Sequence, residues 1–418
     1  MPTRKQILQM IATLPFMAPV ASTFHGLNPN RSGLDSVTNP NKSYSSADGG
    51  SLHSRDLLRE LGLRTFINGR GTITTLSGSL MPPEVIQAIA ATSDRFVNLI
   101  ELNKKAGQRI AEMLRCEDAH VTAGAASAIQ LGTAACITGM DRELVRQIPH
   151  LLDPRPEVII QKSHRFAFDQ MITNCGVNLV EVEGPEEMER AISDQTIMAF
   201  YFNAAREHSI SRDEFVRIGK QYNIPTFNDA AADVPPVDNL FNYIEMGFDL
   251  VTFSGGKAIR GPQSAGLLFG RKDLIEAARL NHSPFGSSGR GMKVNKEEVL
   301  GMMVALELYL NKDHDQEWAM WETWVAQIAE STEEVPGVET EQYIPEVANH
   351  VPHLRIRWDG QRIPITGDKL REQLRSGHPS IEVSGGRDTI EMNVFMMKPE
   401  EVRITGQRIR NLLRKASA

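Results

Sequence analysis

The segment LVTFSGGKAIRG, residues 250–261, places a lysine on a glycine-rich turn directly after a short apolar run. The run has the length of a buried strand, and three glycines leave the turn almost bare of side chains. A solvent-facing turn with an incidental lysine is the simplest interpretation. The alternative is that the amine of Lys257 is a reagent, and that the glycines let a flat, phosphorylated molecule approach the backbone.

The surrounding sequence predicts where this turn lies in the fold. Seven short apolar runs occur between residues 118 and 270, and most are separated by stretches of helical length and spacing. Strands that alternate with helices predict a mostly parallel, seven-stranded sheet covered on both faces. The last two runs are close together, so we expect one of them to be antiparallel. Ligands bind such sheets beyond the carboxyl ends of the strands, which is the predicted position of Lys257.

The chain is long enough for two ordinary domains. A change of pattern after a long helix predicts a second module, with short strands and a final helix, from about residue 330. We expect five parts: an export signal (1–22), a polar linker (23–52), an N-terminal arm with helices (53–105), a large cofactor-binding domain (106–290), and a connecting helix with a smaller α+β domain (291–418).

The first 22 residues resemble a secretory signal, because two basic residues precede a modest apolar stretch and small residues. The start TRKQIL also resembles a twin-arginine signal, with Lys5 in place of the second arginine. The segment after residue 22 is rich in Ser, Asn, Gly and Pro and predicts a linker. We expect an exported or periplasmic protein. A cytoplasmic protein with a short amphipathic helix or a tail is the alternative.

Composition narrows the function classes. The net charge of −7 argues against a nucleic-acid-binding surface, and no apolar run has transmembrane length. Cys116, Cys136 and Cys175 show no CxxC pair and no nearby histidine pattern. We therefore predict no metal site and no disulfide framework.

The small-residue turn VTAGAASA follows the first of the seven runs and opens a helix. Free N–H groups at the start of a helix bind phosphate, helped by the helix dipole. Small residues also simply allow a helix and a sheet to pack closely. The predicted phosphate contacts are Gly124, Ala125, Ala126 and Ser127.

Polar residues follow other runs in the same way. His164 could stack on a flat ring or be an ordinary loop residue, and Asn203 could donate to a ring substituent. Asp229 ends a strand, where a buried carboxylate needs a cationic partner. Ser254 comes three residues before Lys257 and is a further candidate phosphate contact.

Taken together, these residues meet the requirements of pyridoxal 5′-phosphate (PLP). Asp229 would keep the pyridine nitrogen protonated, which strengthens the electron sink. Lys257 would form a Schiff base with the aldehyde, and its amine, once released, would move the α-proton of the substrate.

Four stretches resemble the family of bacterial selenocysteine synthase (seryl-tRNA selenium transferase), which includes D-glucosaminate-6-phosphate ammonia-lyase. They are FINGRGTITTLSGSLMPPEVIQAIAA, VTAGAASA, NDAAAD and FSGGKAIRGPQSAGLLFGR. The resemblance implies the fold-type-I, aspartate aminotransferase-like architecture, a PLP cofactor on Lys257, and a homodimer or higher homo-oligomer. It suggests three arginines for the substrate: Arg260, Arg290 in a loop that would reach a neighbouring site, and Arg387 in the C-terminal module.

The expected reaction is α,β-elimination on a small β-hydroxy amino acid or amino sugar acid, of the ammonia-lyase type. Aldol cleavage, racemisation and transamination use the same lysine and electron sink, so they remain open. Selenium transfer to tRNA is another alternative, although a signal-like stretch stands where the synthase has its tRNA-binding module. The last alternative is a protein that binds PLP without catalysing a reaction.

Overall fold

The computed structural model describes residues 55–417, so the predicted export signal and linker lie outside the described residues. The chain divides into two units, 1–63 and 64–418. In the described part of the first, α2 (Leu57–Glu60) is a single exposed turn, and Asp56 caps it by accepting a hydrogen bond from the N–H of Arg59. The second unit holds the large sheet and every predicted site residue.

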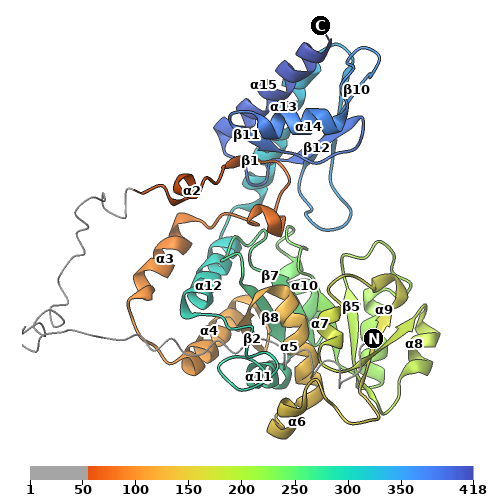
Figure 1. The fold of residues 1–418 in the computed structure, drawn as a ribbon. Coiled ribbons are helices and arrows are strands. Elements are labelled where there is room, and N and C mark those ends of the chain that lie inside the picture. The colour runs from red at the N-terminus through yellow and green to blue at the C-terminus, as the bar shows by residue number, and fades with distance from the viewer. Residues whose placement is uncertain (1–54, 418) are drawn as a thin grey trace, which may run out of the picture. The chain divides into compact units, whose positions relative to one another are not determined.

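A seven-stranded sheet forms the centre of the large domain, in the order β2-β8-β7-β6-β5-β3-β4 (Figure 1). Neighbours from β7 to β4 are parallel, whereas β8 is antiparallel to both β7 and β2. The predicted mostly parallel sheet with an antiparallel late strand is therefore confirmed. The strands are β2 (Asp118–Thr122), β3 (Glu157–Gln161), β4 (Asn178–Val182), β5 (Thr196–Phe202), β6 (Thr226–Asp229), β7 (Leu250–Ser254) and β8 (Gly266–Gly270).

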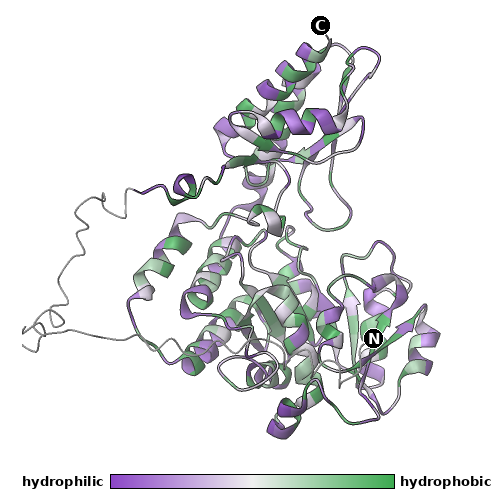
Figure 2. Cartoon of the chain, viewed as in Figure 1, coloured by the Kyte–Doolittle hydropathy of each residue, from purple (hydrophilic) through white to green (hydrophobic). Residues whose placement is uncertain are grey.

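Both faces of the centre of this sheet are buried, which explains why β5, β7 and β8 are nearly continuous apolar runs, whereas the edge strand β4 exposes Asn178 and Glu181. On β7, Leu250 packs into one core, whereas Val251 and Phe253 pack into the core on the other face. Figure 2 shows the central strands in the hydrophobic colour and α6 and α8 mostly in the hydrophilic colour. The first core includes α5 (Gly124–Thr138), α7 (Gln170–Thr173) and α11 (Lys272–Leu280); the second includes α3 (Pro83–Ser93), α4 (Leu99–Leu114), α8 (Pro185–Ala191), α9 (Arg212–Gln221), α10 (Asn239–Met246) and α12 (Lys296–Leu310).

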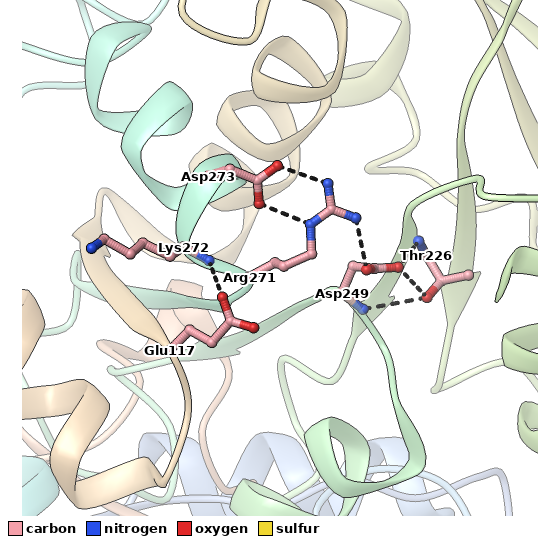
Figure 3. A network of polar contacts seen from close by, with 6 residues as sticks. All are labelled: Glu117, Thr226, Asp249, Arg271, Lys272 and Asp273. Atoms are coloured by element: carbon pink, nitrogen blue, oxygen red, sulfur yellow. Dashed lines mark hydrogen bonds and ion pairs between the residues drawn. The ribbon is translucent and has the colours of Figure 1, made fainter.

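Shorter elements connect these layers: η2 (Thr74–Leu76), α6 (Arg142–Gln147) and η3 (Lys162–His164). An ionic network lies at the amino ends of β6 and β7 (Figure 3). Arg271 bonds Asp273 and Asp249, and Asp249 accepts hydrogen bonds from the backbone N–H and the hydroxyl of Thr226. The network joins β6, β7 and the start of α11, so it braces the end of the sheet opposite the lysine turn.

The smaller domain has its own core around an antiparallel sheet in the order β12-β10-β9. A second, two-stranded sheet pairs β1 in parallel with β11, so a strand from the N-terminal arm belongs to the same core, through Ile67. No helix in residues 55–417 is long and apolar enough to span a bilayer. The elements are β1 (Phe66–Asn68), α13 (His314–Glu333), β9 (Val338–Tyr343), β10 (His353–Trp358), α14 (Gly367–Ser376), β11 (Ser380–Glu382), β12 (Thr389–Asn393) and α15 (Pro399–Ser417).

Candidate active site

A cavity of about 420 Å³ lies at the carboxyl ends of β6 and β7, where the topology predicted a site. It brings together six of the nine predicted cofactor contacts: Gly124, Ala125, Ala126, Asp229, Ser254 and Lys257. Its volume lies within the range of small-molecule and cofactor sites. The other residues that line it are Thr74, Ala123, Ile129, Phe168, Ala231, Gln263 and Ser264.

The first turn of α5 forms one wall of this cavity. Ala123 occupies the N-cap position and has no side chain that could accept a hydrogen bond, so the first N–H groups of the helix have no side-chain cap. Gly124 has φ +76°, in the left-handed region that glycine adopts without strain. This wall can therefore bind an anion through backbone N–H groups and the helix dipole.

The close contact between α5 and β8 depends on a second glycine. A Cβ atom on Gly266 would lie 2.5 Å from the carbonyl carbon of Gly124 and 2.8 Å from the nitrogen of Ala125. The sequence prediction included Ser127 in the same turn, but its hydroxyl lies 3.2 Å from Sδ of Met292, and Ser127 does not line the cavity.

Lys257 and Asp229 lie on neighbouring strand ends. Asp229 is 4 % exposed, and its Oδ1 accepts a hydrogen bond of 3.0 Å from the N–H of Ala231. Burial raises the pKa of Asp229 to about 6, against the lowering effect of that hydrogen bond and of Lys257. Burial lowers the pKa of Lys257, and the two carboxylates of Asp229 and Asp233 oppose that shift.

These shifts suit a reactive amine. A lysine whose pKa is lowered by burial has a larger neutral fraction, and only the neutral amine attacks a carbonyl. Within residues 55–417, Lys257 forms no ion pair within 4.0 Å, so its amine is not held in a salt bridge. The buried Asp229 carboxylate, in turn, has room in the same cavity for a cationic partner.

The glycines beside Lys257 have a packing role that the sequence did not indicate. A Cβ on Gly255 would lie 2.3 Å from Sδ of Met302, and a Cβ on Gly256 would lie 2.5 Å from the carbonyl oxygen of Gln263. The turn is packed against the protein at these two positions. The fold itself therefore requires glycine at these two positions. That they also admit a ring to the backbone stays a prediction.

His164 does not line this cavity. It is buried, its Nδ1 accepts a hydrogen bond of 3.1 Å from the N–H of Phe202, and its Nε2 lies 2.9 Å from Nδ1 of His208. Burial lowers its pKa to about 3, so the ring is neutral. The aromatic side chain that reaches the cavity is Phe168, four residues later and 58 % exposed.

Asn203 also lies outside this cavity. Its Oδ1 accepts a hydrogen bond of 2.5 Å from Nε of Arg212, and its Nδ2 donates to Asp233 and to the hydroxyl oxygen of Tyr243. Both acceptor and donor sides of the amide are therefore engaged by the protein, and the residue belongs to a polar network next to the lysine cavity.

None of the three predicted substrate arginines lines the lysine cavity. Arg260 has φ +58°, and its Nε donates to the carbonyl oxygen of Leu80 at 2.7 Å. Arg290 is exposed, with a long contact of 3.5 Å to the hydroxyl of Ser283, and Arg387 is exposed on the smaller domain.

Sequence reasoning did not single out four polar or aromatic residues that line the cavity. Gln263 and Ser264 are part of the quoted RGPQSAG motif, and Thr74 is part of GRGTITTL, so the motifs carried a signal for them. Phe168 lies in the loop where only His164 was considered. Ser264 donates a hydrogen bond to Glu298 of α12, which fixes its hydroxyl.

The residues present fit PLP. The uncapped first turn of α5 and the hydroxyl of Ser254 suit a phosphate, the buried Asp229 suits a protonated pyridine nitrogen, and Lys257 suits an aldehyde. Residues 66–334 match the family model described as SelA: L-seryl-tRNA selenium transferase. The chain belongs to the SelA family. This confirms the family resemblance found in the sequence.

Three relatives are similar over more than half of the chain. The D-glucosaminate-6-phosphate ammonia lyase of Salmonella typhimurium is 27 % identical over 83 % of this chain and 94 % of its own length. The 5′-C-glycyluridine monooxygenase-decarboxylase of a Streptomyces species is 29 % identical over 77 % of this chain and 82 % of its own length. The L-seryl-tRNA(Sec) selenium transferase of Desulfotalea psychrophila is 26 % identical over 59 % of this chain and 56 % of its own length.

Solved structures agree with the fold class. The structure of D-glucosaminate-6-phosphate ammonia-lyase has a TM-score of 0.77 and 26 % identity, and covers 87 % of this chain and all of that one. The structure of a NifS-like protein has a TM-score of 0.54 and 17 % identity, and the match covers 84 % of this chain and all of that one. The predicted fold-type-I architecture is confirmed, and this SelA-family chain is an enzyme with lyases and transferases as relatives.

Proposed function

We propose that this SelA-family enzyme is a PLP-dependent ammonia lyase that acts on a small β-hydroxy amino acid or amino sugar acid. The observation that carries the proposal is the placement of Lys257 and Asp229 on adjacent strand ends, in one cavity with the uncapped first turn of α5. The similarity to the Salmonella ammonia lyase, over 94 % of its length, supports the reaction type.

The chain's own residues have separate tasks in this reaction. The first turn of α5 and Ser254 would hold the phosphate of PLP, and Asp229 would accept a hydrogen bond from its ring nitrogen. When bound, PLP accepts the electron pair left at the substrate's α-carbon. The Nζ atom of Lys257 takes the α-proton and returns a proton to the departing β-hydroxyl, which leaves as water. One water is then consumed, so the products are ammonia and a 2-keto acid.

A small substrate is favoured over seryl-tRNA. The similarity to the ammonia lyase covers nearly all of that protein, whereas the similarity to the D. psychrophila selenium transferase covers 56 % of its length. The net charge of −7 also disfavours tRNA, because phosphate contacts require basic surface. Export by the first 22 residues, and assembly into a homodimer or higher homo-oligomer, stay predictions.

The reaction type can be tested on the protein reconstituted with PLP. A panel of D- and L-β-hydroxy amino acids and amino sugar acids is incubated with wild type, Lys257→Ala, and Lys415→Ala, which removes an exposed lysine of α15. We expect equal amounts of ammonia and 2-keto acid from wild type and Lys415→Ala, and neither from Lys257→Ala. Oxygen consumption with release of carbon dioxide, or full activity in Lys257→Ala, would contradict the proposal.

A further inference from the structure

A second cavity, of about 290 Å³, lies beside the turn that follows β6 and shares no lining residue with the lysine cavity. The turn contributes Asp229 and Ala231 to the lysine cavity and Asp233 to the second one. The large domain lines it with Asn203, Arg212, Asp233, Pro235, Pro236, Asn239, Asn242, Tyr243 and Met246, and the smaller domain with Glu346, Val347, Ala348 and His350.

Arg212 is the side chain that indicates a ligand. Its Nε donates to Asn203, but its two terminal Nη groups make no hydrogen bond or ion pair with any residue in the range 55–417. The guanidinium carbon lies 6.0 Å from the ring centroid of Tyr201 and 5.9 Å from that of Tyr243. A guanidinium group with a free pair of donors at a cavity wall matches the geometry of a carboxylate.

The polar wall beside Arg212 is already held in place by the protein. The carboxylate of Asp233 accepts hydrogen bonds from Asn203 and from the hydroxyl of Tyr243, the latter at 3.1 Å. The backbone oxygen of Asp233 accepts a further bond of 2.7 Å from Nδ2 of Asn239. Because these groups are fixed in advance, a ligand would lose little free energy in ordering them.

The charges around the cavity select the kind of anion. The cavity lining holds one guanidinium and two carboxylates, Asp233 and Glu346, so a doubly charged phosphate would be repelled by both carboxylates. The three charged side chains sum to −1, so a ligand with a single carboxylate at Arg212 is favoured when its amino group offsets Glu346. Hydroxyl or amino groups on the same molecule would donate to Glu346 and bond the amide of Asn242, which has no side-chain partner in the described part of the chain.

The geometry points to a second binding site for a small carboxylic acid that carries hydroxyl or amino groups, held between Arg212 and Glu346. The ligand would touch both domains, because Glu346 and His350 belong to the smaller domain and Arg212 begins α9 of the large one. The loop that carries Glu346 and His350 already contacts the turn after β6, because the N–H of Asn349 donates to the backbone oxygen of Ala232 at 3.2 Å. The inference does not depend on PLP binding to Lys257.

The site has a spectroscopic reporter. The ring of His350 lies 6.0 Å from the ring of Trp318, measured between centroids. We expect a ligand in the cavity to change tryptophan fluorescence, and calorimetry gives an independent measure of binding. Titration of both wild type and Lys257→Ala separates this site from the lysine cavity, since the variant keeps the second cavity whether or not the proposed reaction is found.

The probes are D-gluconate and L-serine, with inorganic phosphate for contrast. We expect one of the two carboxylates to bind once per chain in Lys257→Ala, at least tenfold more tightly than phosphate. Arg212→Gln should weaken binding at least tenfold. Asn242→Leu replaces the amide by an apolar group of the same shape, outside the Asp233 network, and should do the same. Arg217→Gln changes an exposed arginine of the same helix and should leave binding unchanged.

Three results would overturn the inference: neither carboxylate binds, phosphate binds as tightly, or binding is unchanged in both Arg212→Gln and Asn242→Leu. If Arg212→Gln does not fold, Asn242→Leu decides the question alone, because its side chain makes no hydrogen bond to a described residue.

Discussion

Asp229 shows how a single buried carboxylate connects stability to function. It lies at the end of a strand whose whole length is buried, so its charge is poorly solvated and its pKa is raised to about 6. A cationic partner removes that penalty. The residue is therefore unfavourable for the empty fold, and it would become favourable if a protonated ring nitrogen were bound, which is a pattern typical of functional sites.

Asp229→Asn is therefore expected to stabilise the protein without PLP. Because the pKa of Asp229 in the folded protein lies above its unfolded value of 3.8, wild type loses stability as the pH rises from about 3.8 to about 6, and does not regain it at higher pH. At pH 8 the variant should be more stable by about 1 to 3 kcal/mol, and the gain should shrink as the pH falls toward 4. Urea unfolding at several pH values measures this difference.

Asp273→Asn is the matched control. The hydrogen bond from Arg271 lowers the pKa of Asp273, so the Asp273→Asn variant should be less stable than wild type at neutral pH. Because this ion pair is exposed, the loss should be less than about 1 kcal/mol. An Asp229→Asn variant that is no more stable than wild type at pH 8 would show that the Asp229 carboxylate is already compensated without PLP.

At the scale of elements, β6, β7 and α5 fix the site because their ends meet at one edge of the sheet. Lys257, Asp229 and the Gly124–Ala126 turn could be predicted because topology alone brings strand ends together. The orientation of His164 could not, because backbone N–H groups and His208 decide where its ring points. Thr74 could not be placed either, since it comes from a segment remote in sequence from every predicted strand.

Gly266→Ala tests the packing of α5 on β8. The added Cβ would meet the backbone of Gly124 and Ala125, which must shift the first turn of the helix. We expect PLP to bind at least tenfold more weakly, and the free energy of unfolding to fall by about 1 to 3 kcal/mol. Titration with PLP, followed by absorbance, measures the affinity. Gly360→Ala, at a position of the smaller domain with open space around it, should bind PLP like wild type.

At the scale of the whole molecule, the smaller domain is built from both ends of the described chain. The strand Phe66–Asn68 precedes the large domain, yet it pairs with β11 and contributes Ile67 to the smaller core. The sequence suggested a C-terminal module but gave no sign of this pairing, because a three-residue strand has no detectable periodicity.

Ile67→Ala is expected to destabilise the smaller domain by about 2 to 4 kcal/mol, since it removes buried methyl groups from a packed core. All four tryptophans lie in α13 and β10, so tryptophan fluorescence during urea unfolding follows this domain specifically. Ile344→Ala, at an exposed position of the same domain, should change the midpoint little. Equal midpoints for Ile67→Ala and wild type would mean that β1 is dispensable for the smaller core.

The most direct test of the central claim is to find where PLP attaches. The full-length protein is incubated with PLP, reduced with borohydride, digested, and mapped by mass spectrometry. We predict a yellow absorbance that borohydride abolishes, and a single reduced PLP adduct on Lys257 that is missing in Lys257→Ala. A protein that stays colourless, or an adduct carried mainly by another lysine, would contradict the account.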